Sequence, residues 1–331
     1  MKIFILASAF LLTTSAVSAA PTAEAQLIPF RSGTKMGYTD KTKKVLIRPR
    51  YDFAWPFSEG RAMVLTKGRY GFIDPAGKEV IKPAYRSAGE FREGLAPVEL
   101  KSVWGYIKRD GGTAIPFEYE KALQPSEGRA AAKKDGRWGL IDLASGQFTP
   151  TRYDEIFQFS EGLARVKADG LYGYIDKAGV GIVPPVYDEA FPFQGGFATA
   201  RLRLQYGFIN KGTGIFKARD FFNIGPINEG LAPAEIQEGA SGRCGYINQA
   251  GIEQLPFSWF MCASFSEGLA PVLKSIKGKW GFIDKTGNEV VPFKYDEVSS
   301  FMNGLAKVVR DNKAFYIDTR GVEYINTPAK R

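Results

Sequence analysis

The segment Lys279-Trp280-Gly281-Phe282-Ile283-Asp284-Lys285-Thr286-Gly287 determines the fold, because versions of it recur along almost the whole chain. Its central glycine has earlier counterparts at a spacing of 34 residues, followed by two slightly wider steps, and these are Gly37, Gly71, Gly105, Gly139, Gly173, Gly207 and Gly245. A degenerate last copy reads Ala314-Phe315-Tyr316-Ile317-Asp318. Self-similarity at such a period indicates a tandem repeat of about nine units.

A second motif, Phe-x-Glu-Gly-x-Ala-x-Val, fixes the internal layout of each unit, and its clearest copies begin at Phe57, Phe91, Phe159, Phe265 and Phe301. Its glycine lies 23 residues after the aromatic-Gly glycine in every interval. The remaining interval is 11 residues, except for 15 between Gly230 and Gly245 and 13 between Gly268 and Gly281. Because the insertions fall in one connection, that connection is predicted to be a surface loop.

Short runs of aromatic and β-branched residues bounded by glycine predict strands. Asp284 to Gly287 has the pattern of a hairpin turn with Gly287 at positive φ, and a further strand follows from Glu289 to Asp296. Each unit is therefore predicted to be a three-stranded antiparallel sheet followed by a loop. A helical repeat of the same period is excluded, because 37 Gly and 19 Pro interrupt the chain too often.

The two faces of each predicted sheet are both apolar. Trp138 and Leu140 point to one side and Gly139 and Ile141 to the other, so each sheet must pack against its neighbours and Trp138 is expected to be buried. The glycine is interpreted as a site of close approach to the adjoining unit. Three strands per unit, and no unit visibly shared between the chain ends, favour an all-β open solenoid or superhelix; a β-propeller is the alternative.

The repeated segment resembles the bacterial WG-repeat (KWG-type) family, which is named for the Trp-Gly pair. The pair occurs as Trp104-Gly105, Trp138-Gly139 and Trp280-Gly281, and the resemblance extends over nearly all of residues 20–326. It implies a β-rich repeat array, commonly exported and used for interaction, without general catalytic residues. Tyrosine, methionine or cysteine replaces the tryptophan in other units.

The N-terminus has the pattern of a secretory signal: Lys2, an apolar run from Ile3 to Leu12, and Val17-Ser18-Ala19 before a predicted cleavage site. The run is shorter than the ~20 residues that a membrane span requires. We therefore expect a signal peptide at 1–19, a repeat domain at 20–326 and a short tail at 327–331, in a periplasmic or secreted protein without a membrane span.

The amino-acid composition limits which catalytic groups and metal ligands the chain can offer. The chain contains no histidine, which removes the commonest general base and metal ligand, and no cofactor or metal site is predicted. Glutamates recur at equivalent positions beside glycine, namely Glu59, Glu93, Glu127, Glu161, Glu229 and Glu267. Residues present in so many copies are predicted to serve the scaffold by bonding loop amides rather than to catalyse a reaction.

The net charge is +9, and basic residues gather around the variable hairpin loop. We single out Lys133, Lys134, Arg137, Arg201 and Arg203 as candidate binding residues for an anionic envelope polymer or an acidic protein surface. A solvated basic edge that blocks aggregation is the alternative interpretation. The export signal argues against a nucleic-acid partner.

Residues 215–262 break the repeat pattern and are where an added function would be sought. The candidate binding residues there are the aromatic side chains Phe221, Phe222, Trp259 and Phe260. Cys244 and Cys262 lie in the same segment, and the exported compartment makes a disulfide between them conceivable, with free thiols as the other outcome.

These observations predict an exported, non-enzymatic repeat protein that presents an extended surface for protein or envelope-polymer binding. A carboxylate-dependent, carbohydrate-active envelope enzyme and a passive structural spacer remain as alternatives. An enzyme of the first kind needs a carboxylate pair set apart from the repeats, and none stands out.

Overall fold

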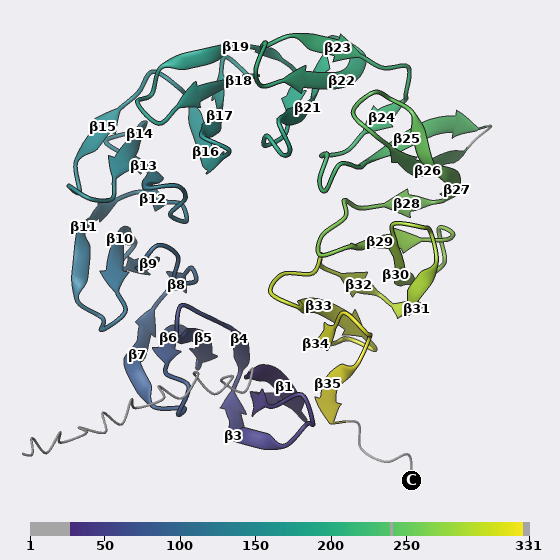
Figure 1. The fold of residues 1–331 in the computed structure, drawn as a ribbon. Helices are drawn as coiled ribbons and strands as arrows, with labels where there is room; N and C mark the ends of the chain where they lie inside the picture. Colours follow the sequence, from purple (N-terminus) through teal and green to yellow (C-terminus); the bar gives the residue numbers. More distant parts are fainter. Residues whose placement is uncertain (1–26, 239–240, 327–331) are drawn as a thin grey trace, which may run out of the picture.

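A computed structural model of the chain describes residues 27–238 and 241–326, and these residues form strands and turns without a helix. Small sheets follow one another around a ring in chain order, with one short strand of nearly every sheet toward the centre and a longer strand at the rim (Figure 1). The all-β prediction and the repeated antiparallel sheets are confirmed. The predicted signal peptide (1–19) and tail (327–331) lie outside the described residues.

The strands of the first half of the ring are β1 (Ile28–Ser32), β2 (Lys35–Thr39), β3 (Val45–Tyr51), β4 (Phe53–Ser58), β5 (Arg61–Thr66), β6 (Arg69–Ile73), β7 (Glu79–Tyr85), β8 (Ser87–Ala88), β9 (Leu95–Leu100), β10 (Val103–Lys108), β11 (Thr113–Tyr119), β12 (Lys121–Ala122), β13 (Arg129–Lys134), β14 (Arg137–Asp142), β15 (Phe148–Pro150), β16 (Glu155–Ser160), β17 (Leu163–Ala168), β18 (Leu171–Asp176) and β19 (Gly181–Tyr187). Those of the second half are β20 (Glu189–Ala190), β21 (Phe197–Leu202), β22 (Gln205–Asn210), β23 (Phe216–Ala218), β24 (Asn223–Ile224), β25 (Ala232–Glu238), β26 (Ser241–Ile247), β27 (Glu253–Trp259), β28 (Met261–Cys262), β29 (Leu269–Leu273), β30 (Trp280–Asp284), β31 (Glu289–Tyr295), β32 (Glu297–Val298), β33 (Leu305–Arg310), β34 (Lys313–Asp318) and β35 (Glu323–Asn326).

The prediction of three strands per unit is wrong for every unit but the first, because a fourth strand lies on the inner side. In the sheet β12–β15, for example, Lys121 and Ala122 pair with Lys133 and Ala132 before the chain reaches the Glu-Gly turn. Most of these inner strands are only two residues long, too short for the alternation by which strands are recognised in a sequence.

The ring closes between the two ends of the described chain, so the open-solenoid prediction is wrong and the propeller alternative describes the arrangement. Strand β35 runs beside β1 in parallel, with Arg31 opposite Ile325 and Ser32 opposite Asn326. Ile28 shares one apolar cluster with Tyr316 and Tyr324. The repeat pattern specifies which faces pack but not the small rotation between successive sheets, and that rotation decides whether an array closes.

The core consists of apolar layers between adjacent sheets. Trp138 and Leu140 pack on one side of their sheet against residues of β16–β19 such as Ile156, whereas Ile141 packs on the other side against Tyr106 of β8–β11. Trp138 is 5% exposed, so its predicted burial is confirmed, while Trp104 and Trp280 are half-buried. Each sheet is thus covered on both faces, as the two apolar faces of its strands require.

The glycine of the aromatic-Gly pair permits a close approach, but to a different neighbour from the one predicted. A Cβ built on Gly139 would lie 2.5 Å from the Phe148 ring and from the Thr149 carbonyl oxygen. On Gly105 it would lie 2.9 Å from the Ile115 carbonyl oxygen. Both contacts are with the rim strand of the glycine's own sheet and not with the adjoining unit, so the glycine permits the rim strand to cross closely.

Two local predictions concern single features of the backbone. Gly287 has φ 86° and its amide donates to the Asp284 carbonyl oxygen at 3.0 Å, as the predicted hairpin turn requires. Cys244 in β26 and Cys262 in β28 form a disulfide with their Cα atoms 6.0 Å apart. The disulfide therefore joins the sheet β24–β27 to the sheet β28–β31.

Candidate functional site

The recurring glutamates bond the amides of neighbouring units. Glu59, at φ 50°, accepts a hydrogen bond from the Gly94 amide in the next sheet at 2.8 Å. Equivalent bonds join Glu93 to Gly128, Glu127 to Gly162, Glu161 to Gly196, Glu229 to Gly268 and Glu267 to Gly304. These carboxylates hold the inner turns together, which accounts for their repetition without any catalytic role.

The pKa of Glu229 illustrates the electrostatics of these turns. Partial burial acts to raise the pKa of this carboxyl, but hydrogen bonds from Lys285 and the Gly268 amide outweigh burial and hold the pKa below its ordinary value. Lys285 Nζ lies 3.0 Å from the Glu229 carboxylate. Glu229 is thus kept ionised, as a structural acceptor should be.

A second set of carboxylates supports the hairpin turns at the opposite edge of the sheets. Asp52 accepts from the Lys67 amide at 2.6 Å, and Asp154 from the Asp169 amide at 2.8 Å. In the irregular segment, phenylalanine replaces this aspartate. Phe222 directly precedes the sheet β24–β27 and Phe260 directly precedes the sheet β28–β31, and the hairpin loops of these two sheets carry the insertions. Phe222 is 65% exposed, whereas Phe260 is half-buried.

The remaining aromatic candidates do not form a common surface with Phe222. Phe221 stacks on Phe257, with ring centroids 5.8 Å apart, and Trp259 is 7% exposed within the core beside the disulfide. Phe221 and Trp259, two of the four aromatic candidates, therefore contribute to packing, whereas Phe222 is exposed.

The basic candidates lie on hairpins of two sheets separated by β16–β19. Lys134 pairs with Glu118 at 2.8 Å and Arg201 with Glu189 at 2.9 Å. The Arg137 side chain is exposed and makes no ion pair or hydrogen bond within the part of the chain that is described. The structure thus brings Lys133, Lys134 and Arg137 together on one hairpin, and it places Arg201 and Arg203 on another.

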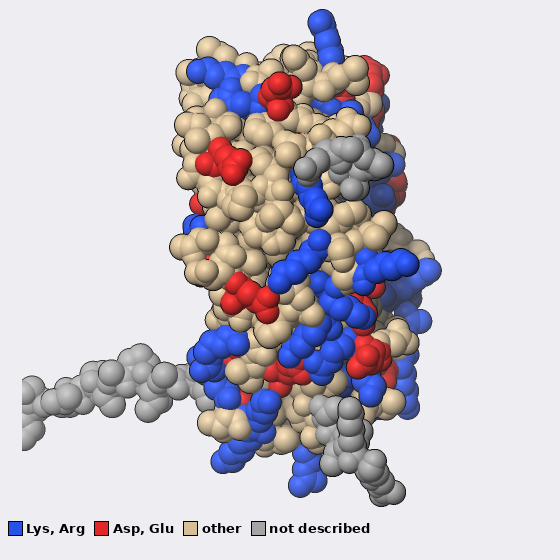
Figure 2. Space-filling view, turned by 90° about the vertical axis from the view of Figure 1, so that its right-hand side faces the viewer, with Lys and Arg blue, Asp and Glu red and all other residues tan. Residues whose placement is uncertain are grey.

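Positive charge alone does not distinguish these hairpins. On the side of the molecule formed by β26–β31 and β33–β35, Lys and Arg gather in the lower half, while the upper half is mostly uncharged (Figure 2). Several cations of these strands and their loops have acidic partners; Lys274 lies 3.2 Å from Glu289 and Lys294 lies 2.8 Å from Glu323. Shape is therefore needed to choose a site.

Two sheets, β12–β15 and β20–β23, differ in shape from most others because their rim strands are short. Strands β15 and β23 have three residues, against seven in rim strands such as β11. In both sheets the turn before the rim strand is one residue longer: the Gly146 amide donates to Asp142, four residues back, whereas Gly111 donates to Lys108, three residues back. The regular sheets recover that residue in a bulge, which these two sheets lack.

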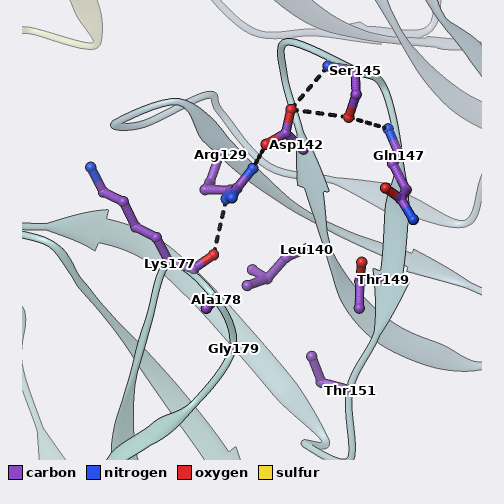
Figure 3. Close-up of a pocket in the computed structure, with 10 residues that line it drawn as sticks. All are labelled: Arg129, Leu140, Asp142, Ser145, Gln147, Thr149, Thr151, Lys177, Ala178 and Gly179. Carbon is purple, nitrogen blue, oxygen red and sulfur yellow. Dashed lines mark hydrogen bonds and ion pairs between the residues drawn. The ribbon is translucent and has the colours of Figure 1, made fainter.

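The shortened rim strand of β12–β15 opens a recess of about 360 Å³ toward the next sheet (Figure 3). We call it the threonine recess, and it is lined by Arg129, Leu140, Asp142, Ser145, Gln147, Thr149, Thr151, Lys177, Ala178 and Gly179. Arg129 pairs with Asp142 and donates to the Lys177 carbonyl oxygen at 3.0 Å. In the view of Figure 3, Leu140 lies between Ala178 of the next sheet and Thr149 of the rim strand.

Two shallow grooves flank the β13–β14 hairpin of the same sheet, and we call them the hairpin grooves. One, of about 590 Å³, is lined by Glu118, Tyr119, Lys134, Asp135, Arg137, Gly146, Phe148 and Pro150. The other, of about 720 Å³, is lined by Lys133, Gly136, Arg137, Pro150, Thr151, Arg152, Tyr153 and Asp154. Arg137 lines both grooves and Thr151 lines the second groove and the threonine recess, so the three openings adjoin one another around one sheet.

Sequence reasoning named Lys133, Lys134 and Arg137 of this site but missed Arg152 and the recesses. The signal was present, because Gly146 follows Gly139 by seven residues whereas Gly111 follows Gly105 by six. The 34-residue period is unchanged by this shift, so the difference is hidden from a search for insertions.

Comparison with protein families identifies the repeat. The model of the WG containing repeat matches residues 36–70, 70–102, 104–138, 138–172, 172–203 and 280–313, which together make up more than half of the chain. The protein belongs to the WG-repeat family. The resemblance inferred from the Trp-Gly segments is confirmed, and the unmatched residues 204–279 contain the segment that the sequence marked as irregular. Among curated proteins, none matches the sequence.

The likeness to one solved structure supports the fold and nothing further. A eukaryotic initiation factor is 10% identical, with a TM-score of 0.63 over 91% of this chain and 95% of that chain. Hsv2 of Kluyveromyces lactis is 9% identical, with a TM-score of 0.43 over 68% of this chain and 90% of its own. The extracellular domain of BT4673 from B. thetaiotaomicron is 11% identical, with a TM-score of 0.33 over 92% and 61%.

Two further observations concern the described residues only. Within 27–238 and 241–326, no group of three His, Cys, Asp or Glu side chains is placed to hold a metal ion. The same ranges contain no helix with the length and apolarity of a membrane span.

Proposed function

We propose that this WG-repeat protein is an exported, non-enzymatic binding protein whose partner is an anionic envelope polysaccharide, held along the rim of the sheet β12–β15. The observation that carries the proposal is the convergence of three openings on this one sheet: Arg137 lines both hairpin grooves, and Thr151 lines the second groove and the threonine recess. Export rests on the N-terminal segment, with its apolar run and small residues before Ala19.

The chemistry of the three openings fits a charged sugar polymer. Arg137 and Arg152 have no carboxylate partner among the described residues, so both guanidinium groups are available to anionic groups of a chain. Thr149 and Gln147 in the adjoining recess offer donors and acceptors for sugar hydroxyls. The openings are shallow and continuous, which suits a polymer better than a small metabolite.

Of the four carboxylates that line these openings, three are already engaged, and the fourth, Asp135, is exposed in the hairpin turn. Asp142 pairs with Arg129, Glu118 pairs with Lys134 and Asp154 accepts the Asp169 amide. A glycosidase needs one carboxylic acid and one free carboxylate across the scissile bond. This engagement favours binding over the alternative of a carbohydrate-active enzyme.

The test is binding of the mature protein to polygalacturonate, with dextran as the neutral polymer, by isothermal titration calorimetry at two salt concentrations. We expect binding to polygalacturonate that weakens with salt, and an affinity loss of about tenfold for Arg137→Ala. Arg69→Ala is the matched control, because Arg69 occupies the equivalent hairpin position in the regular sheet β4–β7.

Three results separate the alternatives. Equal losses for Arg137→Ala and Arg69→Ala contradict the site. Absence of polygalacturonate binding contradicts the polymer and favours a protein partner or a spacer. Shortening of the polymer during the titration, measured by size-exclusion chromatography, contradicts the non-enzymatic part.

A further inference from the structure

The second sheet with a short rim strand, β20–β23, carries a recess of about 350 Å³ on the side of β24–β27. We call it the lysine recess. Its walls include Phe197, Phe208 and Ile215, and its charged residues are Lys217 and Arg219. It lies two sheets away from the threonine recess, so it is a separate site.

The recess exists because one residue that fills this space elsewhere has been replaced. In regular sheets, an aliphatic side chain on the rim strand packs against the turn glycine of the next sheet: a Cβ on Gly111 would lie 3.2 Å from Ile81, and one on Gly321 would lie 3.3 Å from Val291. The strand pairing places Lys217 at the same position, opposite Phe208. Lys217 is exposed, and the corresponding turn glycine, Gly251, meets the Arg219 side chain in place of an aliphatic residue.

Arg219 is held in place by the neighbouring turn. Its guanidinium donates to the Ala218 carbonyl oxygen at 3.0 Å and to the Gln249 carbonyl oxygen at 3.1 Å. Gly251 approaches so closely that a Cβ there would lie 2.5 Å from the Arg219 side chain. A cation fixed in this way loses little conformational entropy when an anion binds.

The charges of the lysine recess are not balanced from within. Neither Asp nor Glu is among its lining residues, and the uncharged ones include Asn210, Thr213 and Gln249. The threonine recess is the counterexample, because there Arg129 is neutralised by Asp142. Two cations beside phenylalanine and isoleucine side chains therefore distinguish this site from its structural twin.

We propose that the lysine recess binds a small organic anion that consists of a carboxylate on an apolar or aromatic body. The carboxylate meets Lys217 and Arg219, and the body lies against Phe197, Phe208 and Ile215, the last of which is 56% exposed. The volume lies within the range of small-molecule sites, roughly 300 to 1,000 Å³. This site is independent of the polymer proposed for β12–β15.

The experiment is an NMR titration of the full mature chain with benzoate, with benzamide as the neutral isostere. We expect saturable benzoate shifts, and binding that is about tenfold weaker for benzamide. Lys217→Ile restores the aliphatic residue of the regular sheets and should abolish benzoate binding while the protein stays folded. Lys217→Gln removes the charge without filling the recess and should weaken binding about tenfold.

Thr149→Ile is the matched control, because it fills the equivalent position in the threonine recess and should leave benzoate affinity unchanged. The proposal is overturned if benzamide binds as tightly as benzoate, if Lys217→Ile retains wild-type affinity, or if benzoate gives no saturable shift up to its solubility limit. An equal loss for Thr149→Ile and Lys217→Ile also overturns it, since binding would then not be specific to this recess.

Discussion

The sheets β8–β11 and β12–β15 are neighbours with the same 34-residue period, yet their rims differ. In the first, Ile115 is 2% exposed on a seven-residue rim strand; in the second, the equivalent Thr149 is exposed on a three-residue strand beside a recess. Compared with β8–β11, the sheet β12–β15 lacks the bulge in its rim strand and has one more residue in the turn before that strand. The comparison teaches that a repeat can acquire a cavity without changing its length, and four predictions test it.

The largest effect is expected from the repeat tryptophans of the two sheets. Trp138→Ala should lower the free energy of unfolding by about 3 to 5 kcal/mol, because the buried indole leaves a cavity between sheets. Trp104→Ala should cost less, since Trp104 is only half-buried. Guanidinium unfolding followed by circular dichroism measures both. Equal losses would show that the two sheets pack their indoles alike.

The aliphatic position on the rim should give the next largest difference. Ile115→Ala should cost about 2 to 4 kcal/mol, because it empties a packed position, whereas Thr149→Ala should stay within about 0.5 kcal/mol. The same unfolding experiment compares them. A cost above 1 kcal/mol for Thr149→Ala would mean that the threonine recess is closed by contacts in solution.

The two turns provide a smaller test. Gly111 and Gly146 both have positive φ, at 91° and 72°, so alanine at either should cost about 1 kcal/mol in backbone strain. Gly111→Ala should cost more, because its Cβ would meet Ile81 at 3.2 Å while Gly146 faces open space. Thermal unfolding measures the difference. A lower melting temperature for Gly146→Ala than for Gly111→Ala would reverse the assignment of the two turns.

The smallest effect concerns acid, and it compares a sheet that has the inner-turn glutamate with one that lacks it. The folded pKa of Glu229 lies below its ordinary value of 4.5, so its contribution to stability is complete above that value and is lost as the pH falls through the folded pKa. Glu229→Gln should flatten the pH dependence of stability below about pH 5. At the equivalent position β20–β23 has Gly195, so Gly195→Ala should leave that dependence as it is in the unaltered protein. An unchanged slope for Glu229→Gln would refute the ion pair with Lys285.

Much of this molecule could be predicted from its sequence, and the omissions have physical reasons. The glycine spacing predicted the units and the turn at Gly287, because hairpin chemistry is local. Two-residue strands such as Lys121–Ala122 were missed, because two residues are too few to show the alternation of apolar and polar side chains, and because their pairing with the following strand is not visible in the sequence. Closure through Arg31 and Ile325 depends on rotations summed over all the sheets, which no single unit records.

The candidate site was predictable only in its charges. Lys133, Lys134 and Arg137 share a hairpin because they are adjacent in sequence, and this much follows from the chain itself. Arg152 joins them only because the rim strand ends early at Pro150. The aromatic candidates could not be sorted by burial from the sequence: Trp259 lies in the core and Phe222 in solvent, although both belong to the same irregular segment.

The junction between β1 and β35 gives the ring a mechanical weak point. Adjacent units elsewhere are joined by the continuous backbone, whereas the first and last units meet through two residue pairs, a hydrogen bond from the Arg31 guanidinium to the Ala314 carbonyl oxygen and one apolar cluster. A force pulling along the ring would be carried by non-covalent contacts at the junction between β1 and β35 and by covalent bonds at all the remaining junctions. Under tension the ring is therefore expected to open between β1 and β35 into an arc, while each sheet and its rim keep their shape.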